Sequence, residues 1–243
     1  QENGSRFTRK VLDFTSPHVE SKVQQILDNL PLKNKATTVL ARLNDQVVDL
    51  SGKHLEAVGT DLLSKGTHRT VYKWRAKEIG GQGTWSTFNT TKRNVVRLWT
   101  VYDLLQKKGQ ILVSTNTTFP LGDIVFTPTS LTTGPIDVVQ FTWQESHPFT
   151  IRALYDLRVN RLKVGEDVCV KVFIISPGKE DDYASMSKID FLRGSVSEPF
   201  KWSKTTAEVP PRVLGNMWNN TQVHVIRPAE DWEKMLRDYI TTL

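Results

Sequence analysis

The spacing of the apolar residues changes near Gly66, and this change constrains the fold more than any other feature of the sequence. Before Gly66 the apolar residues recur at steps of mainly three and four, which is the spacing of one helix face. After Gly66 they mostly alternate with other residues, as they do from Val168 to Ile174, which is typical of strands. The sequence therefore predicts a helical arm that precedes a β-rich body.

We expect two helices in the arm. The first begins at Ser16-Pro17, a favoured cap and first-turn pair, and ends at Pro31. The second runs from about Lys35 to Ser64, is weakened or broken near Ser51-Gly52, and ends at Gly66. The apolar face of the arm packs either on the body of the same chain or on neighbouring chains. In the second case, the residues expected to grip a neighbour are Leu40, Leu43, Val47, Val58 and Leu62.

A series of short alternating or β-branched segments follows Thr67, with turn signals between them. This pattern favours a mainly β fold, and we expect an eight-stranded antiparallel jelly-roll sandwich. The residues after Pro228 return to helical spacing, so a short C-terminal helix is expected. The expected units are a tail and helical arm at 1–66, a jelly-roll domain at 67–227 and a C-terminal helix at 228–243. The expected strands are Arg69–Arg75, Val95–Val101, Gln110–Thr117, Asp123–Phe126, Ile136–Trp143, Thr150–Val159, Asp167–Ile175, Ser187–Leu192, Phe200–Ser203 and Thr221–Ile226.

Composition and motifs exclude several functional classes. No run approaches the roughly 18 apolar residues of a membrane span, and the first residues lack the apolar core of a secretory signal. Cys169 is the only cysteine, so no internal disulfide can form. The five histidines show no metal-ligand spacing, and no phosphate-binding loop or dinucleotide fingerprint is present. We therefore expect no enzymatic activity and no cofactor.

An acidic cluster after a turn is a weak candidate for a metal site. Three carboxylates in one loop can hold a hard cation such as Ca²⁺, although a solvated acidic loop is the plainer interpretation. The cluster consists of Glu180, Asp181 and Asp182.

Basic and aromatic residues interleave from His68 to Arg75, a composition that suits phosphate neutralisation together with base stacking. Strand alternation places the bases on one face and Tyr72 and Trp74 on the other, so a half-buried strand with a basic outer face is the alternative. The net charge of +6 either serves solubility or favours a polyanion. The RNA-contact candidates are Arg6, Arg9, Lys10, Arg69, Lys73, Arg75, Lys92 and Arg93.

Two segments resemble capsid proteins of the picorna-like positive-strand RNA viruses. Lys108–Pro120 runs from a glycine through alternating apolar residues to a proline, and is similar to the first jelly-roll strand of those proteins. Phe149–Gly178, with a very apolar second half, is similar to their central barrel strands. The resemblance covers roughly residues 67–227, rests on no specific motif, and fits a divergent invertebrate virus best because the helical arm is atypical of vertebrate members.

The resemblance implies a structural subunit that assembles with sister capsid subunits into an icosahedral shell around genomic RNA. It implies assembly in the host cytoplasm, location in the virion, and cleavage from a polyprotein, which accounts for Gln1. No small-molecule substrate is expected. The alternative is a non-enzymatic β-sandwich binding module, either a viral nucleic-acid movement protein or a carbohydrate-binding domain. The candidates for an aromatic carbohydrate platform are Trp85, Trp143 and Trp202.

Overall fold

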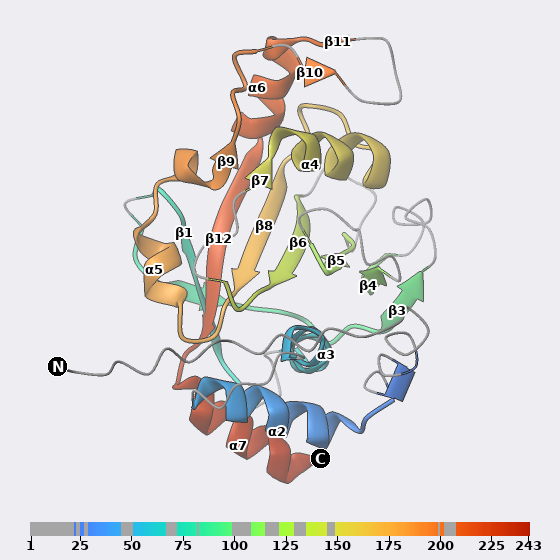
Figure 1. The fold of residues 1–243 in the computed structure, drawn as a ribbon, viewed down its shortest axis with the longest axis vertical. Coiled ribbons are helices and arrows are strands. Elements are labelled where there is room, and N and C mark those ends of the chain that lie inside the picture. Colours follow the sequence, from blue (N-terminus) through green and yellow to red (C-terminus); the bar gives the residue numbers. More distant parts are fainter. Residues whose placement is uncertain are drawn as a thin grey trace, which may run out of the picture.

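The computed structural model is a mixed α/β protein built around one large sheet, with helices on both faces (Figure 1). The residues that the structure describes are 22, 25, 26, 29–44, 51–66, 72–81, 83–98, 108–114, 122–128, 135–144, 149–198, 200–201 and 208–243.

Eight strands form this sheet in the order β2-β1-β12-β8-β6-β5-β4-β3. Most neighbouring pairs are antiparallel, but β6, β8 and β12 run parallel at the centre, and β3 runs parallel to β4. The expected β-rich body is therefore confirmed in part. The strands of the sheet are β1 (Trp74–Glu78), β2 (Ser86–Phe88), β3 (Val95–Leu98), β4 (Ile111–Ser114), β5 (Ile124–Phe126), β6 (Ile136–Phe141), β8 (Val170–Ile175) and β12 (Thr221–Pro228).

Two helical crossovers connect the three parallel strands. The chain passes from β6 through α4 and the π-helix η2 to β8, and from β8 through α5, η3 and α6 to β12. Crossovers are required because a tight hairpin can join only antiparallel neighbours. The elements of this half are β7 (Phe149–Thr150), α4 (Ile151–Tyr155), η2 (Asp156–Arg161), α5 (Glu180–Ser185), η3 (Lys188–Phe191), β9 (Leu192–Arg193), β10 (Phe200–Lys201), β11 (Glu208–Val209) and α6 (Pro211–Asn219).

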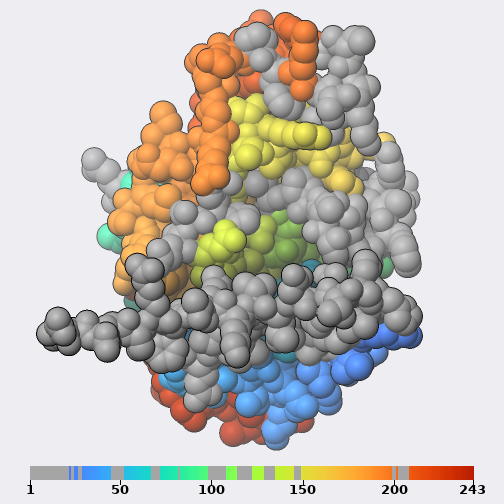
Figure 2. Space-filling model, in the orientation of Figure 1, coloured from blue at the N-terminus to red at the C-terminus, as the bar shows by residue number. Residues whose placement is uncertain are grey.

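The central strands bury both of their faces. On β8, Phe173 and Ile175 join the core beneath α2 (Leu32–Leu43), α3 (Ser51–Ser64) and α7 (Trp232–Thr242). Its alternate residues, such as Val172, join a second core with α4 and α6. Helices α2 and α7 lie against each other at the lower end of the molecule, which Figure 2 shows in space-filling form. Burial on both faces is typical of an α/β sheet.

The arm packs on its own chain. Val58 and Leu62 are fully buried in the core of the sheet, and Leu40 and Leu43 pack partly against the same core. These side chains are therefore not free to grip a neighbour, which corrects the inter-subunit expectation in favour of packing within the chain. Val47 lies outside the described residues.

The jelly roll is not confirmed, because the strands lie in one mixed sheet rather than in two facing antiparallel sheets. Thr150–Val159, predicted as a strand, forms α4 and most of η2. Its buried residues Ile151, Leu154 and Leu157 are spaced by three, so they share a helix face. The Ser187–Leu192 segment is mostly the 3₁₀-helix η3, and α6 was not predicted.

The predicted C-terminal helix is confirmed as α7, and the predicted break in the arm separates α2 from α3. The first predicted helix falls almost wholly outside the described residues, and Pro31 is the N-cap of α2. Helices α2, α3 and α7 share one core with the sheet. The boundaries expected near residues 66 and 228 therefore do not separate independently packed units.

Gly59 allows α3 to approach the sheet closely. A Cβ atom added at Gly59 would lie 2.1 Å from Cε1 of the buried Phe141 ring at the end of β6. We expect Gly59→Ala to lower the free energy of unfolding by about 1–3 kcal/mol, because the helix or the ring must shift. Denaturant unfolding followed by circular dichroism measures the change.

Gly52→Ala is the matched control, because Gly52 begins the same helix and an added Cβ there meets nothing within 4 Å. Alanine is the better helix former, so this variant should be as stable as the wild type or more stable. Equal stability of Gly59→Ala and Gly52→Ala would contradict close packing as the role of Gly59.

Candidate nucleic-acid interface

Strand β1 separates apolar from basic side chains. Trp74 and Ala76 are buried beneath the helices, whereas Arg75 is exposed and Lys77 is partly exposed on the opposite face. Lys73, immediately before the strand, is also exposed. The predicted alternation is therefore confirmed from Tyr72 to Arg75, although the strand runs from Trp74 to Glu78 rather than from Arg69 to Arg75. Residues 67–71 lie outside the described residues. Alternate residues of a strand are about 7 Å apart, so these three cations form a row.

The neighbouring strand β12 adds a fourth cation. The antiparallel register places Arg227 directly opposite Arg75. Like charges directly opposite each other destabilise a sheet by a few tenths of a kcal/mol to about 1 kcal/mol. We call Lys73, Arg75, Lys77 and Arg227 the basic strip. The repulsion between Arg75 and Arg227, at the centre of the strip, opposes folding. The same two side chains are well placed to bind an anion.

Arg227 has two partners within the chain. Its guanidinium lies over the ring of Trp85, with 4.0 Å between the guanidinium carbon and the ring centroid. Its Nη1 lies 3.3 Å from Oδ1 of Asp181 on α5. The Asp181 side chain is 86% exposed, so solvent screens this ion pair and it contributes little. The strip therefore keeps an excess of positive charge.

The other basic candidates do not extend this strip. Lys92 and Arg93 directly precede β3, at the opposite end of the sheet from β1 and β2. The Arg93 guanidinium donates a hydrogen bond to the Thr127 carbonyl oxygen at 2.7 Å and lies over the Phe126 ring. Burial lowers the pKa of Arg93. The candidates outside the described residues are Arg6, Arg9, Lys10 and Arg69.

Glu180 is the member of the acidic cluster that serves the fold. The buried Glu180 carboxylate accepts hydrogen bonds from the Trp232 indole and from the Gly178 backbone N–H, and burial raises its pKa. Asp181 pairs with Arg227. Within the described residues, no group of three or more His, Cys, Asp or Glu side chains is arranged to hold a metal ion. This corrects the weak metal expectation for Glu180, Asp181 and Asp182.

Trp85 and Trp143, two of the residues expected in a carbohydrate-binding platform, do not form an exposed aromatic surface together. Trp85 is partly buried and lies beneath Arg227. Trp143 packs against the core under the helices, with its indole nitrogen buried. Trp202 lies outside the described residues.

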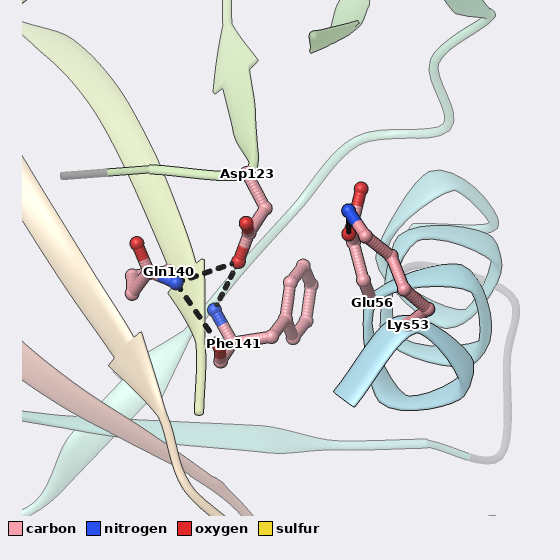
Figure 3. A network of polar contacts seen from close by, with 5 residues as sticks. All are labelled: Lys53, Glu56, Asp123, Gln140 and Phe141. Atoms are coloured by element: carbon pink, nitrogen blue, oxygen red, sulfur yellow. Dashed lines mark hydrogen bonds and ion pairs between the residues drawn. The ribbon is translucent and has the colours of Figure 1, made fainter. Parts of the chain in front are cut away.

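A cluster of polar groups surrounds Asp123, immediately before β5 (Figure 3). Its Oδ2 accepts hydrogen bonds from Gln140 Nε2 at 2.8 Å and from the Phe141 backbone N–H at 2.7 Å. Glu56 and Lys53 of α3, which form an ion pair at 2.9 Å, lie close enough to influence it. Burial, helped by the charge of Glu56, raises the pKa of Asp123 to about 7, although the Phe141 hydrogen bond and Lys53 oppose the shift.

A raised pKa often marks a functional carboxylate. Here, however, the accepting oxygen is engaged within the chain by Gln140 and Phe141. We therefore interpret Asp123 as a structural residue that links β5 to the end of β6, close to α3.

A third group of titratable side chains lies on β6, β8 and β12. Burial raises the pKa of Asp137 to about 6, against the charges of Lys171 and Arg93. Burial and Lys171 lower the pKa of His224 to about 4, and its ring stacks on Phe173 with centroids 5.0 Å apart. His224 is therefore neutral at pH 7. No single stretch of sequence carries a signal for this group, because the sheet assembles it from distant strands.

Sequence reasoning also missed Lys77 and Arg227, and it assigned Trp85 to a carbohydrate platform rather than to this interface. Lys77 continues the alternation of Lys73 and Arg75 by one more step, so the pattern contained that signal. Arg227 and Trp85 join the strip only through the pairing of β12 and β2 with β1. Nothing in their local sequence predicts these pairings.

Comparisons with known proteins identify no relative: no family model, no curated protein and no solved structure matches the chain. Among the residues that the structure describes, no helix is long and apolar enough to cross a membrane. Functional interpretation therefore depends on the geometry of the basic strip.

We expect Asp123→Asn to stabilise the protein at pH 8, because an asparagine Oδ1 accepts the same two hydrogen bonds without ionising. The folded-state pKa of about 7 lies above the unfolded value near 3.9. Ionisation of Asp123 therefore opposes folding above pH 7, and this effect fades as the pH falls and is absent below about pH 4. The gain at pH 8 should be on the order of 4 kcal/mol, because each pKa unit between 3.9 and about 7 corresponds to about 1.4 kcal/mol.

Thermal unfolding of both proteins from pH 4 to pH 8 measures this difference. Asp238→Asn is the control, because Asp238 is exposed on α7, and it should leave the pH profile unchanged. A destabilised Asp123→Asn at pH 8 would show instead that the network requires the negative charge.

Proposed function

We propose that this chain is a non-catalytic RNA-binding protein that holds a phosphate backbone on the basic strip. The observation that carries the proposal is the direct opposition of Arg75 and Arg227, with Lys73 and Lys77 on the same face. Within the described residues, Lys73, Arg75 and Lys77 form no ion pair. An anionic ligand would relieve this repulsion, which the solvent-screened ion pair of Arg227 with Asp181 offsets only weakly.

The length of the strip favours a polymer over a single phosphate. Lys73 and Lys77 are four strand residues apart, or about 14 Å. A row of this length suits successive phosphates, whereas one phosphate is better held by donors that converge on one point. RNA is the polyanion that the resemblance to RNA-virus proteins favours.

We expect Arg75→Gln to weaken RNA binding severalfold without loss of stability, because it removes both a phosphate contact and a like-charge pair. The slope of log affinity against log salt concentration should fall by about 0.7 for single-stranded RNA. Fluorescence anisotropy with a labelled RNA oligonucleotide at several salt concentrations measures both quantities, and thermal unfolding measures the stability.

Lys33→Gln is the matched control, because Lys33 is an exposed cation on α2, far from the strip. It should leave both affinity and slope unchanged. An equal loss in Lys33→Gln, no loss in Arg75→Gln, or tighter binding to heparin than to RNA would contradict the proposal.

The shell subunit is the second candidate, and the two open edges of the sheet favour it. Among the residues that the structure describes, β2 and β3 each pair with one neighbour, and Val95 on β3 is a large apolar side chain that is 41% exposed. Open edges are templates for pairing with another chain, here a sister subunit. If the chain has this role, we propose that it assembles in the host cytoplasm and is located in the virion. This role ranks second because the jelly roll of that family needs two facing sheets.

If the second candidate holds, the purified chain should form oligomers that Val95→Lys dissociates, because a lysine on an edge strand opposes pairing. Size-exclusion chromatography with light scattering and electron microscopy will measure the assembly. Ile189→Lys is the control, since Ile189 is 75% exposed on η3, which lies beside the β1–β2 turn at the other side of the sheet from β3. A monomeric wild type at every concentration, with or without RNA, would exclude the shell role.

A further inference from the structure

We infer that Trp85 and Arg227 form a stacking platform for an unpaired base, so that the basic strip binds single-stranded RNA in preference to duplex RNA. This inference rests on the proposed RNA-binding function and adds the class of RNA. It follows from a place on the strip where, among the described residues, a cation lies over an aromatic ring.

The guanidinium of Arg227 is held over the Trp85 ring at 4.0 Å. One face of the planar guanidinium contacts the indole, and the other face is available to a ligand. The Arg227 side chain is 31% exposed. Guanidinium planes and aromatic rings are the two surfaces on which proteins stack unpaired bases. A base on Arg227 would therefore extend a stack that begins at Trp85.

The surface beside Trp85 is open and polar. An added Cβ at Gly83 meets nothing within 4 Å, so nothing fills the space next to that position. Thr87 is exposed on β2 and lies opposite Arg75, on the same face of the sheet. Its hydroxyl group can hydrogen-bond a base or a ribose, while Arg75 neutralises the adjoining phosphate.

Asp181 occupies the position that a phosphate would take. Its carboxylate holds Nη1 of Arg227 at 3.3 Å, in an ion pair that solvent weakens. A phosphate offers the same charge-assisted contact, and the row of cations beside it favours the exchange. Removal of Asp181 should therefore raise the affinity for RNA of either form, whereas the Trp85 ring should matter only where a base is free to stack.

The test compares a single-stranded RNA with a hairpin duplex of the same length for Trp85→Leu, Trp85→Phe and the wild type. We expect Trp85→Leu to lower single-strand affinity about tenfold and to leave duplex affinity within about twofold. Trp85→Phe keeps a ring and should retain most of the single-strand affinity. Unchanged duplex binding also shows that Trp85→Leu is folded, which matters because Trp85 packs against the core.

Indole fluorescence supplies a second measurement. Single-stranded RNA should quench wild-type emission more than that of Trp85→Phe, which retains the other six of the seven tryptophans. Equal losses of single-strand and duplex affinity in Trp85→Leu, or no loss of either, would overturn the stacking inference. If Arg75→Gln still weakens binding in that case, the RNA-binding function stands; if Arg75→Gln has no effect, the proposed function fails as well.

Discussion

A buried arginine at the start of the central parallel strands aligns the sheet on which the basic strip depends. Arg158 on η2 donates hydrogen bonds to the backbone oxygens of Gly165, Glu166 and Val168, just before β8. It also donates to the Asn220 carbonyl and to the Thr221 hydroxyl, at the start of β12. Burial lowers the pKa of Arg158 to about 10, so it remains a cation at neutral pH, and hydrogen bonds from a charged donor are strong. One side chain thus joins the crossover helix to the starts of two parallel strands, and the alignment of β12 in turn places Arg227 opposite Arg75.

Burial of one face of β1 contributes enough stability to offset the charge repulsion on its outer face. Trp74 packs edge-on against Trp232 of α7, with ring centroids 5.6 Å apart, and Tyr72 packs similarly against Tyr239. The Tyr239 hydroxyl donates a hydrogen bond at 2.6 Å to Asp61 on α3, which links the strand, the C-terminal helix and the arm. Burial of aromatic rings contributes several times the cost of one like-charge pair. The cations of β1 are therefore held on a rigid strand before any ligand arrives, which reduces the entropy lost on binding.

Local patterns in the sequence predicted several helices and strands, but not how the strands pair in the sheet. The alternation through Trp74 and Arg75 identified the buried and basic faces of β1, because that information is local. The parallel pairing of β8 with β6 and β12 was missed, since alternation and apolar content do not specify a strand's direction. The β-branched residues of Thr150–Val159 favoured a strand, yet the spacing of Ile151, Leu154 and Leu157 matches the crossover helix that parallel strands require. The place of Arg227 in the basic strip could not be predicted, because its partners on β1 and α5 are distant in the sequence.

Binding of RNA and pairing of sheet edges are physically compatible, because the sheet keeps them apart. β12, β8, β6, β5 and β4 lie between β1 and the edge strand β3. At about 4.8 Å per strand, the exposed Val95 lies about 29 Å from β1 and about 24 Å from β12, which is more than a Debye length at physiological salt. A chain paired through β3 would therefore leave the strip accessible to RNA. Pairing through β2 would instead place a second copy against Ser86 and Thr87, beside Trp85, where it would compete with a stacked base. Assembly around an RNA is therefore consistent with the geometry only through the β3 edge.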